Sequence, residues 1–344
     1  MLTIYSEAQT LHAGGRELSD GELVPCYECP ERAALVRAAV ASGGIGEIVE
    51  PEPFGRDPLL RVHDPRFVDF LETAWDEWQA AGRGGDALPF SWAGRGMRGI
   101  EPEHIDGRLG HFAFDVSTPV VAGTWTAASA AADVALTGAK RLAGGEQRVF
   151  SLCRPPGHHA GYDFYGGYCF LNNAAIAAQY LVDGGAARVA ILDVDYHHGN
   201  GTQAIFYDRA DVLFASIHAD PRQEYPYFLG YADETGAGAG EGFNANFPLP
   251  WQSPARDWFA ALDAALGRVR QFAPEALVVS LGVDTFAADP ISQFRLETAD
   301  YLEVGARIAA TELPLLLVLE GGYATNDLGA NVVNVLRGAS REHD

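Results

Sequence analysis

The sequence predicts an α/β protein in which helices flank a central, mostly parallel β-sheet. Three observations lead to this prediction: the apolar runs are short, they do not alternate with polar residues, and helix-like segments separate them. Strands that are buried on both faces of a parallel sheet have this continuous apolar character. Because the strand–helix order repeats along the chain, we expect a doubly wound sheet in a single domain spanning residues 1–344.

Six apolar runs are the expected strands: Leu2–Tyr5, Arg148–Leu152, Arg188–Asp195, Val212–Ala219, Ala276–Gly282 and Pro314–Glu320. Two helices are expected to begin where Asp64 and Ser253 each precede a proline, because a capping side chain followed by proline favours a helix start. These helices should reach about Trp78 and Phe272. An Ala-rich helix over Asn173–Val182 should end at the Gly-Gly pair that follows.

Composition and charge narrow the classes of function. The chain has 344 residues, 48% of them hydrophobic, with 24 basic and 46 acidic side chains and a formal net charge of -22. This hydrophobic content supports a large core and argues against disorder. The acidic surface repels nucleic acid and anionic membranes and attracts cationic partners, although many enzymes are acidic for solubility alone.

The cysteines and the N-terminus indicate a compartment. Four cysteines are too few for a disulfide scaffold, and the Cys26–Cys29 pair lacks a second pair to complete a structural zinc site. We therefore expect reduced thiols. The sequence shows no basic and apolar N-terminal signal and no run of about 18 apolar residues, so a cytoplasmic protein is expected, without membrane contact.

One region, residues 82–110, is rich in Gly and Arg and has little apolar periodicity. We expect an irregular loop there. A loop of this length in a compact domain is usually functional or contacts a partner.

Polar motifs follow four of the predicted strands, where ligands bind in open parallel sheets. They are RPPGHHAG at 154–161, DVDYHHGNGT at 193–202, GVDTF at 282–286 and EGGY at 320–323. In an extended chain Asp193, Asp195 and His197 share a face, and two buried carboxylates repel unless a cation joins them. With Asp284 as a further ligand, these groups predict a catalytic metal site with an open position. Each residue alone could instead be a hydrogen-bonding group at a strand end.

Three further side chains suggest amide hydrolysis. Adjacent His158 and His159 follow a rigid Pro-Pro-Gly turn and could transfer protons as base and acid. Tyr323 follows two glycines, which allow a loop to approach a ligand, and its hydroxyl could donate to an oxyanion. Solvated histidines and a packed aromatic are the alternatives.

Five ordered motifs resemble those of the histone deacetylase superfamily, in the arginase/deacetylase fold: RPPGHHA, GGYCFLNNAA, DVDYHHGNGTQ, SLGVDTF and EGGY. The segments ELVPC, FLETAWDEW and FLGYADETG are similar to bacterial acetylpolyamine amidohydrolases. The resemblance implies one Zn²⁺ on Asp195, His197 and Asp284. It also implies that His158 and His159 are the acid/base pair and that Tyr323 polarises the acetyl carbonyl.

The same resemblance implies a substrate tunnel. The Gly167 carbonyl would accept the substrate amide N–H, with Tyr168 and Tyr225 as aromatic walls. The segment 82–110 matches a loop that narrows the site and forms a homodimer. Asp106, near the end of that loop, is the first candidate for binding the distal ammonium of a polyamine, and Glu17 is the second.

Monovalent-cation sites for K⁺ or Na⁺ are also implied by the resemblance. One would use Asp193, Asp195, His197, Ser216 and Ile217. The other would use Phe206, Arg209 and Val212, with Phe243 nearby. Asp193 would then hold His158, whereas His159 would face the neutral Asn200, so His159 should remain neutral more readily and serve as the general base.

The predicted function is zinc-dependent hydrolysis of acetylputrescine, acetylcadaverine or acetylspermidine, with deacetylation of acetyl-lysine or other acylated amines as the alternative. A binuclear manganese ureohydrolase would need a second set of Asp and His ligands, which is not visible. A catalytically inactive binding protein would usually lack Tyr323 or one metal ligand, and all of these residues are present.

Overall fold

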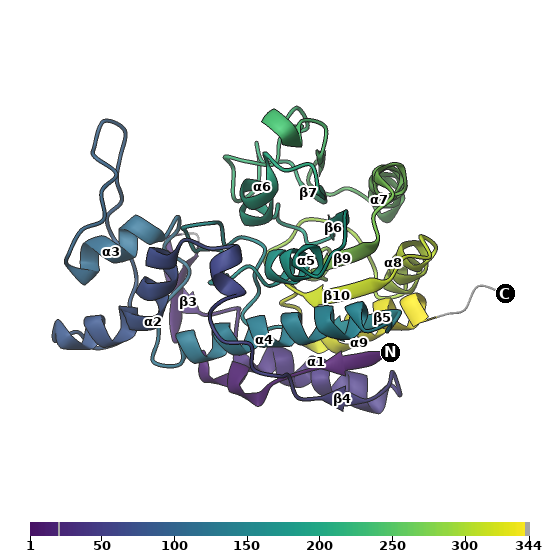
Figure 1. Cartoon of the computed structure of the whole chain (residues 1–344). Coiled ribbons are helices and arrows are strands. Elements are labelled where there is room, and N and C mark those ends of the chain that lie inside the picture. The colour runs from purple at the N-terminus through teal and green to yellow at the C-terminus, as the bar shows by residue number, and fades with distance from the viewer. Residues whose placement is uncertain (20, 341–344) are drawn as a thin grey trace.

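The computed structural model describes residues 1–19 and 21–340, and its described strands form one eight-stranded sheet and a separate hairpin (Figure 1). The sheet has the order β4-β1-β5-β10-β9-β6-β7-β8, and each pairing within it is parallel. Its strands are β1 (Leu2–Ile4), β4 (Ile48–Val49), β5 (Arg148–Ser151), β6 (Val189–Asp193), β7 (Val212–Ala219), β8 (Asn244–Leu249), β9 (Ala276–Leu281) and β10 (Leu315–Leu319). The predicted parallel sheet is confirmed.

All six predicted strands are present, with ends that differ by at most two residues. Two edge strands, β4 and β8, were not predicted. Strand β4 has only two residues, and β8 contains asparagines and a proline, which are uncommon in buried strands. The hairpin of β2 (Arg16–Ser19) and β3 (Glu22–Pro25) is antiparallel and was also missed.

Helices cover both faces of the sheet. They are α1 (Pro30–Ser42), α2 (Pro65–Ala80), α3 (Ile105–Phe112), α4 (Thr124–Ala143), α5 (Asn173–Asp183), α6 (Asn200–Phe206), α7 (Ala255–Phe272), α8 (Asp300–Ala309) and α9 (Thr325–Ser340). Asp64 caps α2 as predicted, because its carboxylate accepts from the Arg66 amide at 2.7 Å. The predicted cap of α7 is wrong. Ser253 instead donates to the Pro250 carbonyl at 2.6 Å, and Pro254 stands at the cap position.

Successive residues of each central strand enter two separate hydrophobic cores. In β6, Val189 and Ile191 belong to the core that includes residues of α4 and α5, whereas Ala190 and Leu192 belong to the core that includes residues of α7 and α8. This alternation is the expected consequence of a side-chain period of two in a sheet covered on both faces. The predicted doubly wound arrangement follows from it.

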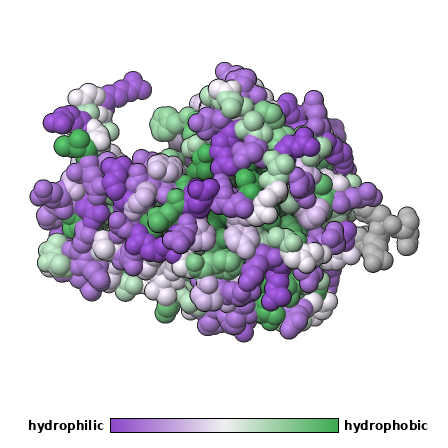
Figure 2. Space-filling model, viewed as in Figure 1, coloured by the Kyte–Doolittle hydropathy of each residue, from purple (hydrophilic) through white to green (hydrophobic). Residues whose placement is uncertain are grey.

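The segment 82–104 is irregular. It is anchored at Ala87, which is buried and bridges Val120, and the part after Pro89 forms an arm that projects from the body beside α3 (Figure 1; Figure 2, upper left). Several of its large apolar side chains are exposed: Phe90, Trp92, Met97 and Ile100. The prediction of irregular structure is wrong for the end of this region, where α3 begins at Ile105. Ile105, Leu109 and Phe112 lie at helical spacing and are buried in the core, which stabilises that helix.

Among the described helices, none is both long enough and apolar enough to cross a bilayer.

Candidate active site

The residues predicted to bind the catalytic metal and to carry out catalysis converge at the carboxyl ends of four adjacent central strands, β5, β10, β9 and β6. A cavity of about 510 Å³ opens above these strand ends. Its base is formed by His158, His159, His197 and Tyr323, which are all less than 9% exposed. The strand order therefore brings together motifs that are up to about 165 residues apart in the sequence.

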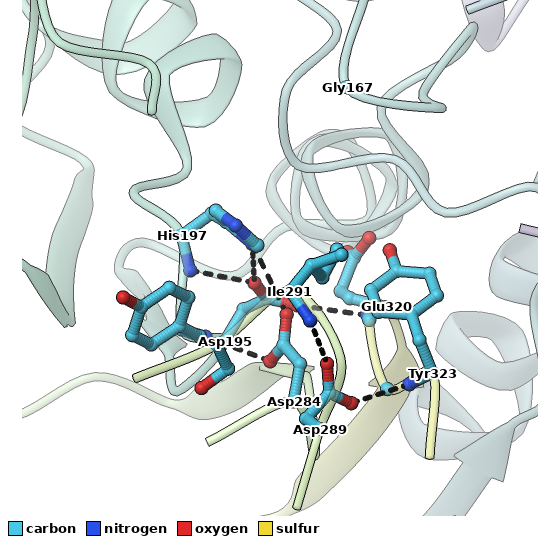
Figure 3. Close-up of polar contacts among 12 residues, drawn as sticks. Gly167, Asp195, His197, Asp284, Asp289, Ile291, Glu320 and Tyr323 are labelled. Atoms are coloured by element: carbon cyan, nitrogen blue, oxygen red, sulfur yellow. Dashed lines mark hydrogen bonds and ion pairs between the residues drawn. The ribbon is translucent and has the colours of Figure 1, made fainter. Parts of the chain in front are cut away.

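Asp195, His197 and Asp284 form a candidate metal-binding group, because their ligand atoms all lie within 4.8 Å of one another (Figure 3). His197 Nδ1 is 3.4 Å from Asp195 Oδ1 and 3.2 Å from Asp284 Oδ2. Strand β6 ends at Asp193, so the extended-chain argument does not reach His197. Instead a turn presents His197, with the Asp195 carboxylate accepting from the His197 amide at 2.9 Å.

The electrostatics of this group favour a bound cation. Burial and the charge of Asp195 raise the pKa of Asp284 to about 7. Two buried carboxylates at this separation repel one another, and a cation between them removes that repulsion. Gly321 is required by the close packing here, because a Cβ at this position would lie 2.5 Å from carboxylate oxygens of both Asp195 and Asp284.

The two adjacent histidines have different partners, as predicted. His158 Nδ1 lies 3.0 Å from Asp193 Oδ2, and His159 Nδ1 lies 2.7 Å from Asn200 Oδ1. Burial lowers the pKa of His158, but the charges of Asp195 and Asp193 outweigh it and raise that pKa to about 10. A cation on Asp195 would offset part of this effect. Burial and the neighbouring His158 hold the pKa of His159 well below its usual value, so His159 is neutral.

Tyr323 borders the base of the cavity with its hydroxyl directed toward the same space as the His197 ring (Figure 3). The Asp289 carboxylate accepts from the Tyr323 amide at 2.7 Å. The Arg32 guanidinium lies 4.6 Å from the ring centroid and donates to the Gly322 carbonyl at 2.7 Å. The loop that carries Tyr323 is therefore held from both sides.

Gly167, Tyr168 and Tyr225 form walls of the cavity, and a single carboxylate connects two of these segments. Asp115 accepts from the Gly167 amide at 2.6 Å and from the Tyr225 hydroxyl at 2.8 Å. Gly167 has a φ of 55°, and a Cβ there would overlap the His159 ring. The position thus requires glycine for both its conformation and its space.

Glu17 is the predicted ammonium-binding residue that the structure brings to the cavity. Its carboxylate accepts from the Tyr168 hydroxyl at 2.7 Å and from the Tyr27 amide at 3.2 Å. Burial raises the pKa of Glu17 to about 7, although the hydrogen bond from Tyr168 opposes this shift.

The prediction for Asp106 is not met within this chain. Asp106 lies in the first turn of α3 and is paired with Arg83 at 2.5 Å, and it does not line the cavity. The reason is that α3 packs against α2, beneath the arm and away from the strand ends (Figure 1).

The residues predicted to hold monovalent cations lie beside the site. Asp193 and Ser216 are direct register partners on β6 and β7, and Ile217 follows. Ser216 Oγ is 2.7 Å from His218 Nδ1. Of the second set, Phe206 ends α6 and its carbonyl accepts from the Arg209 amide at 3.1 Å. Val212 begins β7 in the same region, and the Phe243 carbonyl accepts from the Phe214 amide at 3.0 Å.

Several residues that organise the site were missed from the sequence. Asp115 and Asp289 hold cavity walls through backbone amides, and Glu320 accepts from the Gly157 amide at 2.6 Å. Buried Glu28 pairs with both Arg32 and Arg154 and thereby supports the Tyr323 loop. For Glu320 the EGGY motif was a usable signal. The other carboxylates lie in segments with no distinctive pattern.

Comparisons with known proteins agree with this geometry. The model of the histone deacetylase domain matches residues 26–339. The chain is 57% identical over 343 residues to acetylpolyamine amidohydrolase 2 of Pseudomonas aeruginosa, covering all of both chains. It is 51% identical to the acetylpolyamine amidohydrolase of Mycoplana ramosa, covering 99% of this chain and 100% of the relative.

A solved structure gives the same result. The acetylpolyamine aminohydrolase of Burkholderia pseudomallei superposes with a TM-score of 0.94 at 42% identity, covering 98% of each chain. Together with the cluster of two aspartates, histidines and tyrosine at the strand ends, these matches establish the arginase/deacetylase fold predicted above. The chain belongs to the histone deacetylase domain family and is a hydrolytic deacetylase.

Proposed function

We propose that this chain hydrolyses the acetyl amide of acetylpolyamines, such as acetylputrescine, acetylcadaverine and acetylspermidine, and releases acetate and the free amine. One observation carries the substrate class. Three carboxylates line the cavity, Glu17, Asp115 and Glu224, and none of the described residues that line it is Lys or Arg. Tyrosines form much of the remaining wall. Such a site attracts a slim cationic chain and disfavours an anionic one.

We propose Zn²⁺ as the metal on Asp195, His197 and Asp284. Two carboxylates and an imidazole that converge beside an open cavity are a ligand set typical of a catalytic zinc site. The ion would supply Lewis acidity toward the acetyl carbonyl and the attacking water.

The protein's own groups would carry out the proton transfers. Neutral His159 accepts a proton from the attacking water, and a histidine of this pair returns a proton to the leaving amine. The Tyr323 hydroxyl donates a hydrogen bond to the developing oxyanion. The Gly167 carbonyl accepts the substrate amide N–H, and Tyr168 and Tyr225 pack against the aliphatic chain.

Structural K⁺ or Na⁺ is proposed for the two sets of oxygen ligands beside the site. Asp193 offers a buried carboxylate and its register partner Ser216 a hydroxyl. Oxygen donors of this kind suit hard cations. A cation there would stabilise the turn after β6 that presents His197.

We further propose that residues 1–344 act as one catalytic domain, and that the 82–110 segment mediates a homodimer. The exposed side chains of Phe90, Met97 and Ile100 on the projecting arm support this proposal, because apolar groups gathered on one segment mark a contact surface. Deletion of residues 84–99 should convert the dimer to a monomer in sedimentation analysis. A wild-type monomer at micromolar concentration would contradict the proposal.

Substrate competition tests the function against the alternative, a deacetylase of acetyl-lysine or other acylated amines. We expect kcat/KM for acetylputrescine or acetylspermidine to exceed that for an acetyl-lysine peptide by at least about 100-fold, which is about 2.7 kcal/mol. Equal or greater activity on the peptide would exclude the polyamine assignment and leave the deacetylase assignment intact.

A further inference from the structure

Glu224 lines the cavity next to Tyr225, on the connection between β7 and β8, and its side chain has no role in the proposed proton transfers. Its Oε2 accepts from the Tyr196 hydroxyl at 2.7 Å and from Trp251 Nε1 at 3.1 Å. Its Oε1 accepts from the Tyr225 amide at 3.0 Å. Each carboxylate oxygen can accept two hydrogen bonds, so Oε1 keeps capacity for one more donor.

These contacts join Glu224 to one side chain of the buried core and to one at the mouth of the cavity. Tyr196 is fully buried next to His197, whereas Trp251 is 44% exposed and Tyr227, which also lines the cavity, is 47% exposed. Because one donor is buried and another is exposed, they bond the carboxylate from two sides and hold it in one orientation before any ligand binds. A preorganised group of this kind loses little conformational freedom when a ligand arrives.

The charge of Glu224 is not balanced by the protein. Its three hydrogen-bond donors are neutral, and the ion pairs within residues 1–19 and 21–340 include none to Glu224. Asp220, four residues earlier on the same connection, differs, because it is paired with Arg222 at 2.6 Å. A held carboxylate without a cationic partner, at a cavity wall, favours a positively charged ligand.

The aromatic neighbours fit the same ligand. Trp251 and Tyr227 are exposed at the mouth, and indole and phenol rings attract an ammonium group through their electron-rich faces. The other two carboxylates that line the cavity, Glu17 and Asp115, also have no basic partner among the described ion pairs. Asp115 already accepts from the Gly167 amide and the Tyr225 hydroxyl, whereas Glu17 lies on β2 and is bonded to Tyr168. Besides Asp115, the cavity thus offers two acidic positions on separate segments, Glu17 and Glu224.

We propose that Glu224, together with Trp251, is a second ammonium subsite, which binds the second of the two cationic amino groups that an acetylated triamine carries. This inference rests on the proposed function and refines it. The Glu17 position holds one ammonium group and the Glu224 position holds the other. An acetylated diamine, with a single ammonium group, uses the Glu17 position.

The test compares Glu224→Gln with wild type on three substrates: an acetylated triamine, an acetylated diamine and an uncharged acetylated alkylamine. The substitution keeps the size of the side chain and an oxygen for Tyr196 and Trp251, but removes the charge. We expect kcat/KM for the triamine to fall about tenfold or more, since a hydrogen bond to a charged group contributes that much. The loss for the diamine should stay below about threefold, and the uncharged amine should be unaffected.

Asp233→Asn is the matched control, because it removes the same charge from the same connection at an exposed position that does not line the cavity. It should change none of the three rates by more than about twofold. Binding of the free triamine, measured by calorimetry without catalysis, should weaken in Glu224→Gln in parallel with kcat/KM. Binding of the free diamine should change little.

Three results would overturn the inference. Equal losses for diamine and triamine would mean that no second subsite exists. A comparable loss for the uncharged amine would mean that Glu224 acts only through Tyr196 and the adjacent His197. Unchanged triamine kinetics would remove Glu224 from recognition. By contrast, a wild-type enzyme that prefers acetyl-lysine peptides would refute the proposed function itself.

Discussion

The base and the mouth of the cavity are built in different ways. At the base, each functional side chain lies within eight residues of the end of a buried parallel strand: Asp195 and His197 after β6, Asp284 after β9, and Tyr323 after β10. At the mouth, Glu17 comes from a hairpin, Tyr168 from a loop and Glu224 from the connection between β7 and β8. The sheet positions the proposed catalytic groups, and the hairpin and loops around it form the entrance through which a substrate would reach them.

This difference predicts where substitutions cost most. In the proposed mechanism, a side chain at the base acts on the reacting atoms whatever substrate is bound. A side chain at the mouth would contact only the distal part of a substrate, so its contribution would depend on what that part carries. Variants at the base should therefore lower kcat for all substrates, and variants at the mouth should change KM selectively.

Loss of a metal ligand should have the largest effect. Asp284→Ala should reduce both bound zinc and kcat by more than the 10- to 100-fold that loss of an outer-shell partner typically costs. Metal content by elemental analysis and steady-state kinetics would measure this, with exposed Asp57→Ala as the control. Full activity in a metal-free preparation would refute the metal site.

Tyr323→Phe should have the second-largest effect on kcat. Removal of one donor to the developing oxyanion should lower kcat by about 10²–10³, as for other oxyanion-hole deletions. Zinc content should stay at the wild-type level, because Tyr323 is not in the candidate metal group. If kcat falls less than tenfold, the hydroxyl does not contact the transition state.

A smaller effect, a shift of the pH profile, is expected from a change beside His159. His159 Nδ1 lies 2.7 Å from Asn200 Oδ1, so Asn200→Asp would place a carboxylate oxygen against this nitrogen. A carboxylate there favours the imidazolium form of His159. The pKa of His159 should rise, so the acid limb of the kcat/KM profile should move to higher pH by about one unit or more. An unchanged pH profile would mean that His159 is not the general base.

The smallest effect is expected at the mouth. With a pKa of about 7, Glu17 becomes protonated as pH falls through 7 and then attracts an ammonium group less. The kcat/KM for an acetylated diamine should therefore decline a few-fold more steeply below pH 7 than that for an uncharged acetylated amine. Glu17→Gln should abolish this difference. Parallel pH profiles for both substrates in wild type would place the ammonium group elsewhere.

The sequence by itself was enough to predict the doubly wound sheet and the residues that form the base of the cavity. Buried parallel strands have continuous apolar character, and their polar residues concentrate at the strand ends, so RPPGHHAG, DVDYHHGNGT, GVDTF and EGGY stand out without any coordinates. The edge strand β8 and the helix α3 were not predicted from the sequence. Half of the residues of β8 are polar or proline, and α3 is a short amphipathic helix in a Gly-rich region.

Only the tertiary structure decided which carboxylates line the cavity. Glu17, Asp106, Asp115 and Glu224 are each a single acidic residue in an unremarkable segment, and local sequence does not reveal the direction of a loop. Packing of α3 against α2 pairs Asp106 with Arg83, whereas the connection after β7 turns Glu224 toward the strand ends. Loop direction depends on long-range contacts, such as Asp115 with Tyr225, that form only when the whole sheet has assembled.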